Sequence, residues 1–84
     1  MKKGESVKCI VDYDLFGVNI KGKEGCYIKE DKNTGKCLIW FECNGEWAEL
    51  KNTQFERMHE KGHVSKKNKE FVKKVKKLKY ASST

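Results

Sequence analysis

The close spacing of turn signals restricts the fold of this chain more than any other feature. Residues 32–35 (KNTG) and 44–47 (NGEW) are both typical of tight reversals, because Asn and Gly accept the positive φ angles that such turns require. The segment between them, KCLIWFEC, is rich in aliphatic and aromatic residues and indicates a strand. Short strands separated by tight turns predict a small β structure for the first part of the chain.

Hydrophobic alternation places the other strands. Val7, Cys9, Val11 and Tyr13 alternate with more polar positions, which is the period of a half-buried strand. Residues 15–25 contain three glycines and predict a long, partly packed loop. The expected strands cover residues 5–14, 26–31, 36–43, 47–50 and 56–58, with a turn over 51–55 before the last one.

About five short strands within the first 58 residues favour a small, partly open barrel, because closure limits the exposed edges of a sheet. The long first loop and the short turn before the last strand favour the SH3-like type. An OB fold needs a helix between its third and fourth strands, for which the chain has no room. We therefore predict an all-β, five-stranded SH3-like barrel over residues 1–58 and a linker over 59–65. A Lys-rich amphipathic helix or tail is predicted over 66–84.

The formal charge of the protein is concentrated at its C-terminal end. From Glu60 onward nine lysines oppose two glutamates, which leaves a net charge of +7. Over residues 1–59, ten basic and ten acidic side chains cancel. The body is therefore neutral, and the C-terminal segment carries the whole net charge.

This basic segment also has helical periodicity. Phe71, Val75 and Leu78 recur at helical spacing, and lysines fill most of the other positions. We predict an amphipathic helix over residues 66–80, with Ser65 or Asn68 as its N-cap.

No residue pattern supports catalysis, so we expect no enzyme, no cofactor and no metal. Residues 59–63 (HEKGH) match the H-E-x-x-H pattern of zinc proteases, but Gly62 weakens a helix there and no third ligand follows. The four cysteines are spaced too widely for a zinc site and stand in apolar or strand-like segments, which favours buried free thiols. No phosphate loop, dinucleotide fingerprint or nucleophile–base arrangement is present.

Several stretches resemble known families. KGKEGCYIKED resembles the KOW motif, with Gly25 and Tyr27 as its glycine and apolar residue. That resemblance implies an SH3-like barrel in contact with RNA or ribosomal proteins. The opening KKGESVKCIV, the middle GKEGCYI and the closing GEWAELKNTQFERM are similar to small SH3-like proteins of cyanobacteria and plastids, such as the variable chain of ferredoxin–thioredoxin reductase. This second resemblance implies an accessory subunit of a photosynthetic electron-transfer complex.

A neutral barrel joined to a basic segment predicts a partner with negative charge. We expect an acidic protein or multisubunit complex, whose groove would hold the apolar stripe with lysines at the rim. RNA or a ribosome, bound through phosphate contacts, is the alternative. Membrane contact would be shallow, or peripheral through the complex. A solvated, partly disordered tail is also compatible with the composition. No small-molecule substrate is expected.

The candidate partner-binding residues combine surface aromatic side chains with the basic segment. We expect Tyr13, Phe16 and one tryptophan to form a surface patch. The apolar runs are too short to cross a bilayer and no secretory signal is visible, so the expected location is the cytoplasm or the plastid stroma. The full set of candidates is Tyr13, Phe16, Trp47, Lys66, Lys67, Lys69, Phe71, Lys73, Lys74, Val75, Lys76, Lys77, Leu78 and Lys79.

Overall fold

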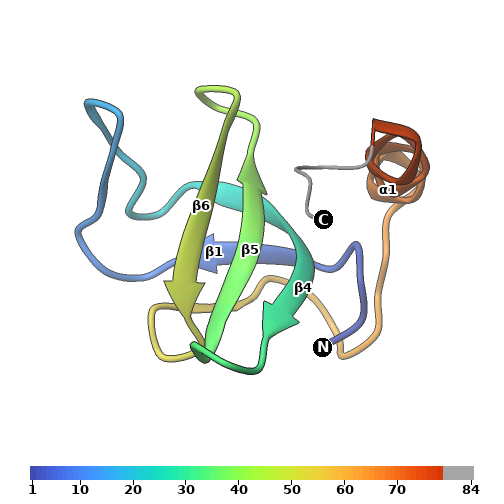
Figure 1. Ribbon diagram of the computed structural model, residues 1–84, viewed down its shortest axis with the longest axis horizontal. Coiled ribbons are helices and arrows are strands. Elements are labelled where there is room, and N and C mark those ends of the chain that lie inside the picture. Colours follow the sequence, from blue (N-terminus) through green and yellow to red (C-terminus); the bar gives the residue numbers. More distant parts are fainter. Residues whose placement is uncertain (79–84) are drawn as a thin grey trace.

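A computed structural model describes residues 1–78 of the chain, with the backbone alone for residues 76–78. Figure 1 shows a strongly curved sheet with a helix beside it. The described elements, in chain order, are β1 (Ser6–Cys9), β2 (Asp14–Leu15), β3 (Val18–Asn19), β4 (Glu24–Asp31), β5 (Lys36–Phe41), β6 (Glu46–Lys51), β7 (Phe55–Arg57) and α1 (Lys66–Leu78).

The main sheet has the strand order β6-β5-β4-β1-β7, and every neighbouring pair is antiparallel. β2 and β3 form a separate hairpin. The edge strands β6 and β7 do not pair with each other, so the barrel is not closed within residues 1–78. The prediction of a small, mostly β, antiparallel structure is confirmed, and four of the expected strands lie within a few residues of β4, β5, β6 and β7.

The first strand and the loop after it differ from the prediction. β1 ends at Cys9, where its pairing with β7 ends, and does not continue to residue 14. Asp14–Leu15 pairs with Val18–Asn19 around a turn in which Phe16 and Gly17 have φ angles of 51° and 87°. Positive φ at both turn positions is what the commonest two-residue hairpin requires. Part of the expected loop is therefore a hairpin.

β4 is covered on both faces and forms the middle layer of the molecule. Tyr27 belongs to the main core on one face, whereas Cys26 and Ile28 belong to a second apolar cluster on the other. The buried residues of the main core are Val7, Cys9, Leu15, Ile20, Tyr27, Cys37, Ile39, Phe41, Ala48, Leu50 and Phe55.

Gly25 allows the main core to approach β4 closely. A Cβ atom at this position would lie 2.5 Å from Cγ2 of Ile39 and 3.1 Å from two ring atoms of Phe41. Such distances are well inside van der Waals contact, so any larger residue would push these side chains out of place. The packing of β5 against β4 therefore requires glycine here.

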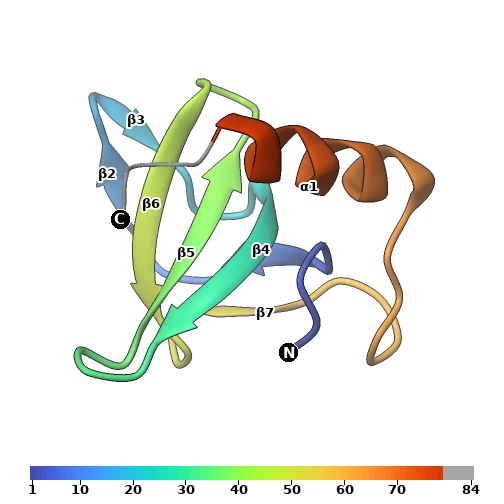
Figure 2. The same cartoon turned by 45° about the vertical axis from the view of Figure 1, so that its right-hand side comes forward.

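The helix α1 lies across the outer face of β4 and β5, as Figure 2 shows. Phe71 stacks on Trp40 with ring centroids 5.5 Å apart, and its ring lies 6.1 Å from that of Trp47. Complete burial of a large apolar side chain adds about 1.5–3 kcal/mol to the free energy of unfolding. The second cluster, which these contacts cover, contains Cys26, Ile28 and Leu38 with Trp40, Trp47, Phe71 and Val72 packed against them.

The apolar stripe of the helix therefore faces the chain's own sheet. Phe71 and Val75 were expected to bind a partner, but Phe71 packs on Trp40 and Val75 is only 9% exposed. The sequence predicted that a groove on a partner would hold this apolar stripe. The protein's own sheet holds it instead, because β4 and β5 carry apolar residues on both faces. The described helix ends at Leu78.

Candidate binding groove and lysine face

Polar contacts at the first turn fix α1 in place. Ser65 is the N-cap, since its Oγ accepts a hydrogen bond from the backbone N–H of Asn68 at 3.1 Å. The Asn68 side chain is buried, and its Nδ2 donates to the carbonyl of Gly4 at 2.8 Å and to Oγ of Ser6 at 2.9 Å. These hydrogen bonds fix the rotation of α1 about its own axis relative to the sheet.

A partly buried ion pair fixes the segment that leads to the helix. Glu5 is 2% exposed, and its carboxylate accepts hydrogen bonds from Nε of Arg57 and from the backbone N–H of Lys2, both at 2.7 Å. Burial alone would raise the pKa of Glu5. The Lys2 amide, the Arg57 side chain and the Gly62 amide outweigh burial and hold that pKa below its usual value. The ionised carboxylate thus holds the segment around Gly62 close to the sheet.

The packing of the apolar stripe turns a set of lysines away from the sheet. Lys66, Lys69 and Lys73 are exposed, and helical geometry places them on the side opposite Val75. We call these three residues the lysine face. Because the helix is held on the sheet, its charges form a preformed surface of the domain.

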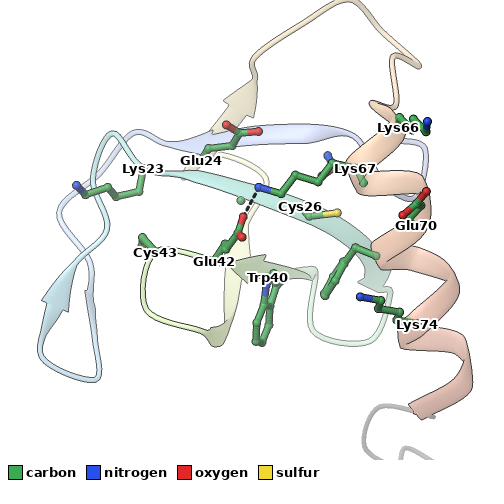
Figure 3. Close-up of a pocket in the computed structure, with 13 residues that line it drawn as sticks. Lys23, Glu24, Cys26, Trp40, Glu42, Cys43, Lys66, Lys67, Glu70 and Lys74 are labelled. Carbon is green, nitrogen blue, oxygen red and sulfur yellow. Dashed lines mark hydrogen bonds and ion pairs between the residues drawn. The ribbon is translucent and has the colours of Figure 1, made fainter.

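A groove of about 750 Å³ lies between α1 and the chain segments beside β4 and β5 (Figure 3). The apolar part of its lining consists of Cys26, Trp40 and Phe71. The helix contributes Lys66, Lys67, Glu70 and Lys74 to the rim. The opposite side contributes Lys23, Glu24 and Glu42.

An ion pair spans this groove. Nζ of Lys67, on α1, donates to Oε1 of Glu42, in the turn after β5, as the dashed line in Figure 3 shows. The hydrogen bond to Glu42 and the charge of that carboxylate raise the pKa of Lys67. Both side chains are mostly exposed, at 73% and 67%, so the pair can open without burying an isolated charge.

The candidate aromatic residues do not form the single patch that the sequence predicted. Tyr13 packs against the main core, and Trp47 packs under the helix on the other face of the sheet. Phe16 is 76% exposed at the turn of the β2–β3 hairpin. The expectation was wrong because Tyr13 and Trp47 are both partly buried and pack against different clusters.

The lysines of the candidate set lie on α1 as expected. Lys66, Lys67, Lys69, Lys73 and Lys74 are all exposed. The side chains of Lys76, Lys77 and Leu78, and the whole of Lys79, lie outside the described residues.

Sequence reasoning missed the sheet side of the groove. Trp40 and Phe41 are neighbours in a strand and must face opposite sides, which was a usable signal that one of them leaves the main core. Nothing local, however, showed that Glu42 and Lys23 would stand opposite the helix.

Cys9, Cys26 and Cys37 are buried, as predicted, but the prediction was wrong for Cys43, which is exposed in the turn after β5. Burial and the nearby charge of Glu24 raise the pKa of the Cys26 thiol to about 11. Burial and Glu30 also raise the pKa of Cys37. These two thiols are therefore protonated at neutral pH and contribute apolar packing instead of nucleophilic chemistry.

The H-E-x-x-H match does not adopt the geometry that its chemistry needs. Residues 59–62 form a bend and a turn, whereas a zinc protease needs both histidines on one face of a helix. His59 and His63 are exposed, with ring centroids 4.9 Å apart. Among the described residues, no cluster of three or more His, Cys, Asp or Glu side chains could hold a metal ion.

Comparison with family models, with curated proteins and with solved structures found no match to this chain. In the described part of the chain, α1 is neither long nor apolar enough to cross a membrane.

Proposed function

We propose that this chain is a non-catalytic accessory protein that docks on an acidic surface of a larger protein assembly. The observation that carries this proposal is the packing of Phe71 and Val72 against the cluster on β4 and β5, together with the burial of Val75. This packing leaves the lysine face exposed on the folded domain. A helix that is already ordered loses less conformational entropy on binding than a tail that must fold. Its lysines would be attracted to carboxylates and would align the two surfaces on encounter.

We also infer that the barrel is of the SH3-like type. The strand order β6-β5-β4-β1-β7 supports this assignment. The β2–β3 hairpin, which lies between β1 and β4 in the chain, and the short turn before β7 also support it. The resemblance to plastid and cyanobacterial accessory subunits would make the partner a photosynthetic electron-transfer complex. That part of the proposal stays a prediction.

RNA binding is the second candidate, and one observation favours it. Trp40 and Phe71 stand beside lysines in the groove, and surfaces that mix aromatic rings with positive charge bind single strands by stacking. Against it, the single arginine of the sequence, Arg57, is paired internally with Glu5. Arginine is the residue that makes bidentate contacts with phosphates and bases. We therefore rank the protein partner first.

A capture experiment tests the proposal. Tagged full-length protein is incubated with native lysate of its source cells in moderate salt, with and without nuclease. We expect protein partners that survive nuclease and are lost from a variant with Lys66→Glu, Lys69→Glu and Lys73→Glu. The matched control carries Lys29→Glu, Lys32→Glu and Lys36→Glu, which changes the net charge equally on the exposed β4–β5 hairpin.

The two candidate functions give different results. If the captured partners disappear after nuclease treatment, the association depends on RNA, and RNA binding takes the place of the accessory function. Equal loss from both triple variants would mean that net charge, and not the lysine face, drives the association.

A further inference from the structure

The ion pair between Lys67 and Glu42 occupies a position that a ligand could take. It crosses the groove, as the dashed line in Figure 3 shows. The apolar lining of that groove is Cys26, Trp40 and Phe71. Exposed pairs of this kind contribute little net free energy, because both charges are well solvated when they separate. A carboxylate from another chain could therefore replace Glu42 at low cost.

The charges around the groove favour an acidic ligand of limited charge. On the helix side, Lys66, Lys67 and Lys74 outnumber Glu70. Lys23, Glu24 and Glu42 stand on the other side, and the two carboxylates would repel a chain with a negative charge at every position. A nucleic acid strand brings one phosphate with each nucleotide. A peptide with a few carboxylates placed toward the helix fits this lining better.

The apolar lining favours an aromatic side chain in such a peptide. Trp40 and Phe71 are half-buried and stacked, and both line the groove. Further rings pack well on such a pair in offset or edge-to-face arrangements. The groove volume, about 750 Å³, falls within the range of sites that enclose small ligands or a few residues of a peptide.

We infer that the groove binds an acidic peptide segment carrying one aromatic side chain, and that Glu42 acts as an internal competitor for Lys67. The aromatic ring packs on Trp40 and Phe71, while a carboxylate of the segment accepts the hydrogen bond that Lys67 now donates to Glu42. This inference rests on the proposed function, since it names the part of an acidic partner that enters the domain.

The test uses the full chain and a fluorescent synthetic peptide of serines and glycines that carries one phenylalanine and a few aspartates. Binding is followed by fluorescence anisotropy at low ionic strength. Lys67→Gln should weaken binding about tenfold, because it removes the charged donor. Glu42→Gln should strengthen binding about threefold, because it removes the competitor. A peptide with serine in place of phenylalanine should bind about tenfold more weakly.

Matched variants separate the groove from general charge attraction. Lys51→Gln and Glu49→Gln both change exposed side chains of β6 that lie outside the groove lining and outside the lysine face. Each should change the affinity by less than about twofold. Circular dichroism confirms that the variants fold, and all four substituted side chains are exposed.

Several outcomes would overturn the inference. Equal weakening by Lys67→Gln and Lys51→Gln would mean that binding follows charge alone, as would equal strengthening by Glu42→Gln and Glu49→Gln. No binding of the peptide, or its displacement by oligouridine, would also exclude the inference. In each of these cases Lys69 and Lys73, which lie outside the groove lining, could still capture the partner from lysate, so the proposed function is judged separately.

Discussion

Glu5 is a carboxylate with 2% of its surface exposed, which is rare unless the charge is compensated. Its charge is compensated by the nearby Lys2 amide and, from the far end of the sheet-forming segment, by the Arg57 side chain and the Gly62 amide. Removal of such a charge-assisted contact leaves Arg57 without its partner and loosens the segment before α1.

The lowered pKa of Glu5 makes a prediction about acid stability. Stability from this carboxylate is fully present above its unfolded-state pKa and is lost as the pH falls through the lower folded-state pKa. The free energy of unfolding of the wild type should therefore fall more between about pH 7 and about pH 3 than that of Glu5→Gln. At neutral pH the variant should be less stable by about 1–3 kcal/mol.

Urea unfolding at a series of pH values measures both effects. Glu49→Gln is the control, because that side chain is exposed and should leave the pH dependence almost unchanged. Parallel curves for wild type and Glu5→Gln would show that folding does not lower the pKa of Glu5.

At the scale of the element, α1 depends on the sheet for its stability. A helix of 13 residues is marginal by itself, and neighbouring lysines repel one another along it. The isolated segment lacks stabilising tertiary contacts. The sheet supplies them through the contacts of Phe71 with Trp40 and Trp47 and through the hydrogen bonds of the buried Asn68 side chain.

Truncation of Phe71 should therefore release the helix. We expect Phe71→Ala to lower the free energy of unfolding by about 2–3 kcal/mol, since the ring is half-buried and not fully enclosed. Lys73→Ala on the exposed side should change it by less than about 0.5 kcal/mol. Denaturant unfolding followed by tryptophan fluorescence measures this, because Trp40 and Trp47 both contact Phe71. Similar effects of the two substitutions would contradict the packing of α1 on β4 and β5.

At the scale of the whole molecule, β4 and β5 form a layer shared by two apolar clusters. The main core lies on one side, and the helix covers Cys26, Ile28 and Leu38 on the other. The helix is thus a structural layer of the domain as well as the carrier of its charge.

Removal of that layer should expose an apolar surface. We expect a fragment of residues 1–64 to keep its β structure but to self-associate, because Ile28, Leu38 and the two tryptophans would face water. Light scattering at increasing concentration measures the association, with the full chain as the control. A fragment that stays monomeric and melts at the same temperature as the full chain would show that the helix does not cover this face.

Much of the secondary structure could be predicted from the sequence because its causes are local. Asn44-Gly45 and residues 32–35 specify turns by their own backbone preferences, and alternation marks the strands between them. Ser65 was a recognisable N-cap for the same reason. The β2–β3 hairpin was missed because its turn places Phe16 at a positive φ, where Asn or Gly is usual.

Tertiary structure decided what each apolar surface touches. The periodicity of Phe71 and Val75 specified a buried face but not the surface that buries it. That choice depends on Trp40 and Leu38, about thirty residues earlier in the chain, and on the contact of Asn68 with Gly4 and Ser6. The groove arises in the same way, since Lys67 meets Glu42 only after the helix has packed on the sheet. Local sequence determines which segments can form strands, turns and helices. Their long-range packing determines which of their side chains remain free to bind a partner.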